Sequence, residues 1–333
     1  MGDILRAALT IGLGIGGFVG GLLLIYAATN LLPTKLRGGG QLAVFIGPVL
    51  LLLFIGLFVP AIQSIVLSFT RDPQLPAGNH GLLANFGFIF GDKNLRQSVF
   101  NSLVWVIGGG TVSTIFGLMI ARFADGMKRE SIVKSMIFIP VALSLAGAGI
   151  IWKFVYDGPP FNYGLLNAIT KIIPGLPDSV GGDGQRSWII ESGLGMNTLL
   201  LVIVLIWVQT GFALIVLSAA IKGVPESLAE AARVDGATDR QIFYRITVPF
   251  IRPALLTVIT TGTIASLKAF DIVQAMTGGN FNTSTIANEY YTNFSVQNRD
   301  NVAAALGVVL FLMVIPVVIL NSRGQKRASE LAG

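Results

Sequence analysis

The sequence predicts an all-α, polytopic membrane protein, and three observations point to this fold class. Hydrophobic residues make up 53% of the 333 residues and charged residues only 12%, whereas soluble domains carry roughly a quarter charged residues. The mean hydropathy is +0.74. Long apolar runs recur along the chain, and basic residues gather in alternate connections between them. Most of the chain is therefore expected to lie within a lipid bilayer.

The apolar runs are long enough to cross the bilayer as helices. A transmembrane helix needs roughly 20 apolar residues, and about seven such runs can be placed on the chain. Each backbone donor and acceptor must be satisfied within the hydrocarbon, so these runs predict a helix bundle. The expected spans lie at about residues 11–29, 42–69, 98–121, 132–154, 198–221, 250–272 and 302–320.

The charge pattern predicts the orientation. Basic residues are enriched in cytoplasmic loops of membrane proteins, which places the N-terminus outside and the C-terminus in the cytoplasm. The net charge of +6 is thus a topology signal. Nucleic acid is excluded as a partner, because no soluble basic domain is visible. The basic residues concerned are Lys35, Arg37, Arg122, Lys128, Arg129, Lys134, Lys222, Arg233, Arg240, Arg245, Arg323, Lys326 and Arg327.

Three parts are expected along the chain. Residues 1–40 form an extra transmembrane helix with a glycine hinge, residues 41–322 form the main transmembrane domain, and residues 323–333 form a basic cytoplasmic tail. The first apolar run is longer than the 7–15 residues typical of a signal peptide, and a basic connection follows it, so we expect it to be retained as a helix. The chain has no cysteine, which excludes disulfides and thiolate metal sites.

A polar connector at about residues 222–248 separates two apolar runs. Pro225 suits the first turn of a helix, where its missing N–H is not needed, and Glu226 favours the positive end of the helix dipole. A short helix is expected to run to about Val234. Gly236 is expected to end it in the left-handed conformation.

A second short helix is predicted directly after the first. Thr238 and Gln241 have the spacing of a capping box, and the helix is expected to continue to about Ile246. Pro249 and Pro253 restrict how the chain re-enters the membrane. The connector is thus predicted to be two short helices joined by a hinge on the cytoplasmic face.

The connector resembles the "EAA" loop by which the membrane subunit of a binding-protein-dependent ABC importer contacts its ATPase. The residues that carry this resemblance are Glu230, Ala231, Ala232, Asp235, Gly236, Ala237 and the following Pro249. Across about residues 42–321 the chain is similar to permeases of the carbohydrate-uptake branch, the maltose and α-glucoside type. The recurring segments are 151–152, 163–167, 270–273 and 277–279. The extra N-terminal helix also resembles the maltose type, whereas the large periplasmic insert is absent.

The resemblance implies a function and a set of partners. The chain would be a permease subunit in the bacterial cytoplasmic membrane, with a six-helix core, that translocates a sugar such as maltose or trehalose. Its partners would be an ABC ATPase dimer, a second and different permease subunit, and an extracytoplasmic solute-binding protein. The chain itself would bind no cofactor, since ATP and Mg²⁺ are used by the ATPase. We expect Glu230→Lys or Gly236→Asp to uncouple transport.

No catalytic or metal-binding constellation is visible in the sequence. No lysine follows a glycine, so the phosphate-binding loop Gly-x-x-x-x-Gly-Lys-Ser/Thr is missing and the chain is not expected to hydrolyse ATP. It is therefore predicted to be a transport subunit and not an enzyme.

The resemblance places the solute pathway on the helices that flank the connector. The residues concerned are Gln209, Phe212 and Ala213 before it, and Gly262, Ala265, Ser266 and Ala269 after it. The second group has i, i+3, i+4, i+7 spacing, which predicts one helix face. These small residues fit close helix packing as well as a sugar site. Gln209 and Phe212 are the better candidates, because an amide and an aromatic ring suit the hydroxyls and the apolar face of a sugar.

Two alternatives remain open. An importer for another solute, such as glycerol phosphate, would need a cationic site, and Lys268 is the only cation near the proposed face. A stand-alone secondary carrier would leave the connector unexplained and is expected to carry buried acidic residues, for which only Asp271 is a candidate. Lys268 and Asp271 lie three residues apart, and we expect them to pair on one helix.

Overall fold

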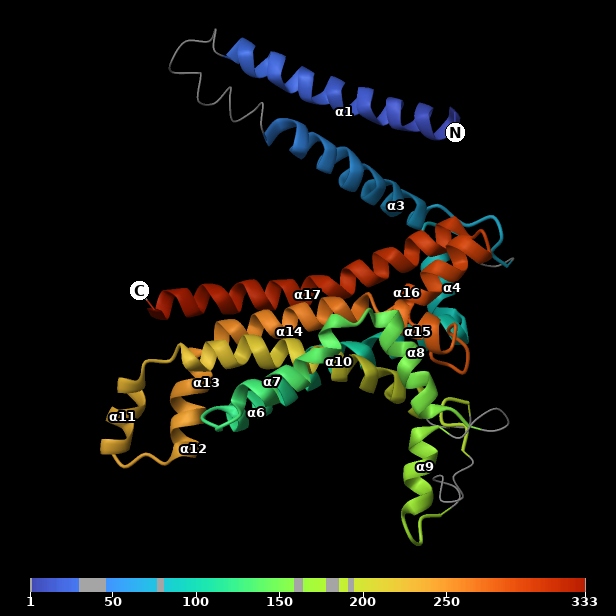
Figure 1. Cartoon of the computed structure of the whole chain (residues 1–333). Helices are drawn as coiled ribbons and strands as arrows, with labels where there is room; N and C mark the ends of the chain where they lie inside the picture. The colour runs from blue at the N-terminus through green and yellow to red at the C-terminus, as the bar shows by residue number, and fades with distance from the viewer. Residues whose placement is uncertain are drawn as a thin grey trace. The chain divides into compact units, whose positions relative to one another are not determined.

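The computed structural model describes residues 2–29, 46–76, 81–158, 164–177, 186–190 and 195–332. All regular secondary structure in these residues is helical (Figure 1), which confirms the predicted all-α class. The chain forms two compact units, Met1–Val66 and Leu67–Gly333, which are described separately. The predicted glycine hinge at 38–40 lies outside the described residues.

The first unit contains two apolar helical segments. Helix α1 spans Gly2–Thr29 and includes a shorter apolar stretch, Gly12–Leu24. The second segment spans Ile46–Phe69, ending just beyond the unit, and none of its most apolar window is buried. It includes a π-helical turn, η1 (Phe54–Phe58), and α3 (Val59–Phe69). A helix that is apolar on all sides and unburied suits contact with lipid.

Four described helices are long and apolar enough to cross a membrane, and two bent helix pairs bring the number to six. The four are Ile46–Phe69, Lys93–Ala124, Met196–Lys222 and Asp300–Gly324. The bent pairs are Glu130–Ala142 with Leu145–Tyr156, at 103°, and Asp239–Phe250 with Arg252–Leu267, at 68°. The multi-pass architecture is confirmed, whereas the count of about seven and the orientation stay predictions.

The second unit is a helix bundle from which the segment of α11 and α12 projects at one end (Figure 1). Its first half contains α4 (Ala84–Gly91), α5 (Lys93–Val106), η2 (Ile107–Val112), α6 (Ser113–Ala124), α7 (Glu130–Phe138), η3 (Ile139–Ala142), α8 (Leu145–Tyr156) and α9 (Leu165–Ile172). Its second half contains α10 (Met196–Lys222), α11 (Glu226–Val234), α12 (Asp239–Ile242), η5 (Phe243–Thr247), α13 (Val248–Phe250), α14 (Arg252–Leu267), α15 (Asp271–Met276), α16 (Ile286–Tyr291), η6 (Thr292–Val296) and α17 (Asp300–Ala332).

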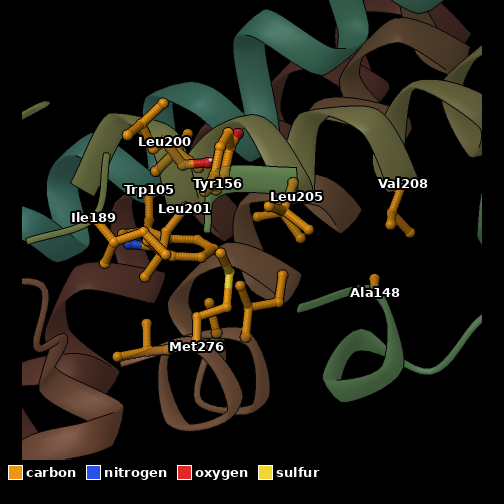
Figure 2. Close-up of a cluster of buried hydrophobic side chains, with 14 residues drawn as sticks. Trp105, Ala148, Tyr156, Ile189, Leu200, Leu201, Leu205, Val208 and Met276 are labelled. Carbon is orange, nitrogen blue, oxygen red and sulfur yellow. Dashed lines mark hydrogen bonds between the residues drawn. The ribbon is translucent and has the colours of Figure 1, made fainter. Parts of the chain in front are cut away.

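Helix α10 is the central element of this unit. Its 27 residues correspond to a length of about 40 Å, enough to cross the hydrocarbon core. Leu201, Leu205 and Leu214 on it are fully buried. Around its N-terminal half lies a cluster of buried apolar side chains that includes Trp105 and Tyr156 (Figure 2). The Tyr156 hydroxyl donates a hydrogen bond of 3.1 Å to the Leu200 carbonyl, so the one polar atom of this ring is satisfied.

Glycines bring the helices around α10 into close contact. A Cβ built on Gly109 would lie 2.0 Å from the Ser266 hydroxyl oxygen, and one built on Gly110 would lie 2.4 Å from the Thr263 hydroxyl oxygen. The turn η2 therefore rests directly on α14. A Cβ on Gly117 would lie 2.4 Å from Cβ of Ala213, which sets the separation of α6 and α10. Small residues at such contacts are typical of membrane helix packing.

A polar loop at residues 277–285 closes the end of the bundle at which α10 begins. The Asn101 amide donates hydrogen bonds to the carbonyls of Asn282 and Ser284, at 2.7 and 2.8 Å. The Asn197 amide donates to the Phe281 carbonyl at 2.9 Å. Phe281 and Asn282 have φ of 57° and 59°, a conformation that costs energy for residues with a side chain. The side chains of α5 and α10 thus hold this loop in its conformation.

Candidate functional site: the coupling loop and the helices behind it

The first connector helix, α11, spans Glu226–Val234 and ends at the predicted residue, but it begins one residue after Pro225, which was expected in its first turn. Pro225 is its N-cap, and Glu226 lies in its first turn. No residue of α11 is buried, and Val234 is 89% exposed. In Figure 1 the loop of α11 and α12 projects from the helices of the bundle. The helix is therefore exposed and projects away from its own bundle.

The hinge between the two connector helices has the predicted geometry. Gly236 has φ of 82°, the left-handed conformation that glycine adopts without steric cost. The Ala237 amide donates to the Ala232 carbonyl at 2.9 Å, which closes the end of α11. Arg233 and Asp239 form an exposed ion pair of 3.6 Å across the hinge.

The capping box that begins α12 is present. The Thr238 hydroxyl accepts from the Gln241 amide at 3.3 Å, and the Gln241 side chain accepts from the Thr238 amide at 2.8 Å. The two residues therefore satisfy one another's otherwise unpaired backbone donors. A cavity of about 260 Å³ lies beside them, between the hinge and Arg245. The cavity is lined by the hinge and by the segment that begins with α12.

The connector returns to the bundle through a sharp bend. Ile251, which is only 2% exposed, lies between two helical segments that differ by 68° in direction. Pro249 lies in the first turn of α13, and Pro253 lies in the first turn of α14. Pro253 costs no helical hydrogen bond at this position, whereas Pro249 directly follows the π-helical turn η5. The Arg122 guanidinium lies 5.8 Å from the centre of the Phe243 ring, so α6 contacts the returning segment.

An ion-pair cluster joins α7 to the end of α10. Glu130 pairs with Lys222 at 2.7 Å and also with Lys134. Lys134 in turn contacts the hydroxyl of Ser218. Lys222 is the last residue of α10, four residues before α11 begins, so the cluster fixes the point from which the connector starts. No local pattern in the sequence predicts this cluster, because Glu130 and Lys222 are far apart in the chain.

The residues assigned to the solute pathway lie in two environments. Ala213, Gly262, Ser266 and Ala269 are buried. A Cβ on Gly262 would lie 2.5 Å from the Gly109 carbonyl oxygen, and the Ser266 hydroxyl donates to the Gly262 carbonyl at 2.6 Å. In this conformation these residues make close helix packing contacts, one of the two roles expected for them.

Gln209 and Phe212 on α10 are partly buried. Phe212 packs against the apolar cluster that contains Ala121, Leu214 and Val258. Ala269 does not lie on the predicted face of α14, because the helix ends at Leu267. The assignment of Gln209 and Phe212 to the solute pathway stays a prediction.

The expected pair of Lys268 and Asp271 does not form. Lys268 follows the last residue of α14 and Asp271 begins α15, so they do not share a helix. Both side chains are exposed, and no ion pair joins them in the described structure. The prediction was wrong because the helix was extended past its end.

Comparison with known proteins agrees with these features. Residues 113–329 match the family described as "Binding-protein-dependent transport system inner membrane component", and the chain belongs to this family. It is an integral, multi-pass protein of the inner membrane. The matched region includes the whole connector and both helices that flank it.

Individual relatives cover most of the chain. It is 39% identical to the osmoprotective compounds uptake permease protein GgtC of Synechocystis, over 86% of this chain and 99% of the relative. It is 40% identical to the alpha-glucoside transport system permease protein AglF of Rhizobium meliloti, over 86% of this chain and 82% of that one.

A solved structure shares the fold. It belongs to a bacterial alginate ABC transporter in complex with an alginate-bound periplasmic protein, and it aligns with a TM-score of 0.70 at 20% identity. The alignment covers 88% of this chain and 96% of that chain. The family match and the relatives of 39% and 40% identity identify the protein as an ABC importer permease, and this solved structure shows the same fold.

Proposed function

We propose that this chain is a permease subunit that imports a neutral sugar, of the oligosaccharide or α-glucoside class, such as maltose or trehalose. The proposal rests on one observation above all. An exposed two-helix connector with the Glu230–Ala237 sequence belongs to a chain that is 40% identical to an alpha-glucoside permease over 86% of its length.

The connector is proposed to bind an ATPase subunit. Helix α11 is exposed, Gly236 allows its sharp turn, and Glu130 anchors the end of α10 just before it. A displacement of α11 would be passed to α10 on one side and to α14, through the bend at Ile251, on the other. For ATP to drive transport, the ATPase must bind one bundle conformation more tightly than another.

Further partners complete the proposed machine. Two ATPase subunits would use ATP and Mg²⁺, since the chain has no phosphate-binding loop and is proposed to have no ATPase site of its own. A second, different permease subunit would form the other half of the pathway. An extracytoplasmic solute-binding protein would deliver the sugar, as the alginate transporter's periplasmic protein supports.

The solute pathway is proposed to pass Gln209 and Phe212. Both are partly buried on α10, the helix that leads to the connector. Ala213, Gly262, Ser266 and Ala269 would be uncovered when α10 and α14 separate. The glycerol phosphate alternative has less support, because Lys268 is exposed at the helix end.

The experiment is purification of the tagged chain from its native membrane in mild detergent, with mass spectrometry of the proteins that co-elute. An ATPase, a second permease and a solute-binding protein are expected. Reconstituted vesicles containing this complex and the binding protein should take up radiolabelled maltose or trehalose when ATP is present on the ATPase side. Recovery of the chain alone, under conditions that preserve a known ABC complex, would favour a stand-alone carrier.

A further inference from the structure

A polar cavity lies at the end of the bundle opposite the connector. Its volume is about 280 Å³, and it lies between α5, the 277–285 loop and α16 to α17. Among its lining residues are Phe88, Asp92, Asn288, Glu289, Asn293 and Arg299. A second cavity of about 250 Å³ lies beside it and shares Glu289 with it. None of the residues predicted for the solute pathway lines either cavity.

Four side chains of this cavity carry buried polar atoms that lack a hydrogen-bond partner. They are Oγ of Ser284, Oδ1 of Asn288, Oδ1 of Asn293 and Nε of Arg299. Asn288 and Asn293 are each only 2% exposed. A buried polar atom without a partner costs about 1–3 kcal/mol, so four in the wall of one cavity require an explanation. A bound polar ligand would supply it.

The chemistry of the wall selects a ligand with hydroxyl groups. The amide oxygens of Asn288 and Asn293 and the carboxylates of Asp92 and Glu289 accept hydrogen bonds, whereas Arg299 only donates them. A hydroxyl both donates and accepts, and can therefore satisfy either kind of group. A metal cation would leave Nε of Arg299 unpaired and would be repelled by its charge.

The charge and the volume of the cavity restrict the class of ligand further. Asp92 and Glu289 would repel an anion such as a phosphate ester or a uronate. The Phe88 ring, which lies 5.7 Å from the Arg299 guanidinium, provides an apolar face of the kind on which a sugar ring packs. The volume of about 280 Å³ is slightly below the range of drug-sized ligand sites, and suits about one sugar ring.

We propose that this cavity is a second, outer sugar site, which binds one neutral polyhydroxylated ring before the solute enters the pathway at Gln209 and Phe212. The proposal rests on the proposed import of a neutral sugar. The cavity would then discriminate against phosphorylated and acidic solutes at the entrance. The partly buried carboxyl of Glu289 and the guanidinium of Arg299 are its specificity-determining groups.

The test measures sugar binding by the assembled transporter in lipid nanodiscs, without the solute-binding protein. Radiolabelled maltose and trehalose are titrated onto the wild type and onto Glu289→Gln and Arg299→Gln. Loss of a charged hydrogen-bond partner should raise the Kd for the sugar by about tenfold or more. Asp271→Asn is the matched control, because it makes the same carboxyl-to-amide change at an exposed residue that does not line the cavity, and it should bind within about twofold of the wild type.

Two further arms complete the test. In the first, the Phe212→Ala variant should still bind sugar at the outer site, whereas its uptake of sugar should fall. In the second, sn-glycerol 3-phosphate serves as the anionic probe, and a tenfold excess of it over maltose should not displace the sugar. Recovery of the ATPase with each variant checks that it folds, and Asn293→Ser replaces any variant that fails this check.

Three results would overturn the proposal: wild-type affinity in the cavity variants, displacement by the phosphate ester, or no sugar binding by the wild type. If the complete system still takes up maltose or trehalose in any of these cases, only the outer site is refuted. If the complete system imports neither sugar, the proposed function itself fails.

Discussion

Gly117 and Ala213 bring α6 and α10 so close that a methyl group cannot be added between them. A Cβ on Gly117 would lie 2.4 Å from Cβ of Ala213 and 2.9 Å from the backbone nitrogen of Leu214. Because α10 leads directly into the connector, this contact fixes the position of the helix through which coupling is proposed to act. Further close contacts at Gly109 and Gly262 do the same for α14.

We expect Gly117→Val to destabilise the bundle. Overpacking a well-packed core costs about 1–3 kcal/mol, and here a backbone atom is in the way. The measurement is the yield and thermal stability of the purified chain. Gly87→Ala is the control, because a Cβ on Gly87 would meet nothing within 4 Å. A Gly117→Val variant as stable as this control would contradict the close contact.

Glu230→Lys and Gly236→Asp are expected to abolish solute-stimulated ATP hydrolysis by the complex while membrane insertion stays normal. Both residues are exposed on the connector, so the core stays intact. Glu230→Lys reverses the charge of the surface offered to the ATPase, and Gly236→Asp places a side chain at the left-handed hinge. The assay is ATPase activity with and without loaded binding protein. Asp271→Lys is the matched charge reversal at an exposed position outside the connector. Normal uptake by either connector variant would count against the proposed coupling.

Thr238→Val should loosen α12 by removing the capping hydroxyl. The loss of an N-cap costs about 1 kcal/mol, equivalent to about a fivefold rise in local opening. The backbone amide of Gln241 donates a hydrogen bond to the Thr238 hydroxyl, so the rate of hydrogen exchange at this amide reports the opening of α12 directly. Thr238→Ser keeps the hydroxyl and should exchange like the wild type, and equal exchange in the two variants would argue against the cap.

Asn101→Asp should destabilise the 277–285 loop. The Asn101 amide group donates to two backbone carbonyls, and an ionised carboxylate can only repel them. Leaving these buried acceptors unpaired is expected to cost about 1–3 kcal/mol each. Limited proteolysis within this loop is the measurement, with the exposed Lys93→Ala as control. Unchanged protection in the Asn101→Asp variant would refute the role of this amide.

Stability should depend on pH through Glu289. Burial raises the pKa of Glu289 above its ordinary value of 4.5; the nearby Ser284 hydroxyl opposes this, and the Asp92 carboxylate adds to it. The folded protein therefore holds this proton more tightly than the unfolded chain, and stability falls as pH rises from 4.5 through the raised pKa. Relative to the wild type, Glu289→Gln should gain Tm between pH 4.5 and pH 7. A difference independent of pH would contradict the shift.

Features encoded by neighbouring residues could be predicted from the sequence. The end of α11, the left-handed Gly236 and the capping box of Thr238 and Gln241 depend on interactions within a few residues, and all three are confirmed. The prediction for Lys268 and Asp271 failed because a helix end is a weak local signal. No glycine or proline marks the end of α14 at Leu267.

Features that depend on distant partners could not be predicted. The Asn101 amide contacts a carbonyl 181 residues further along the chain, and Gly109 matters because Ser266 lies against it. The outer cavity combines residues from 88 to 299, and no single stretch carries its signal. The small residues on α14, such as Gly262 and Ser266, were a local sign of close packing, but they did not identify the partner helix.

The most direct test of the central claim is a cross-link from the connector. The chain has no cysteine, so Ala231→Cys, on the exposed face of α11, introduces a single reactive thiol. A photoreactive cross-linker on this thiol, in native membranes, should capture an ATP-binding subunit, and Gly87→Cys at the opposite end of the bundle should not. Capture of the ATPase by both variants or by neither, in membranes where the chain is intact, would contradict the assignment of α11 as the coupling helix.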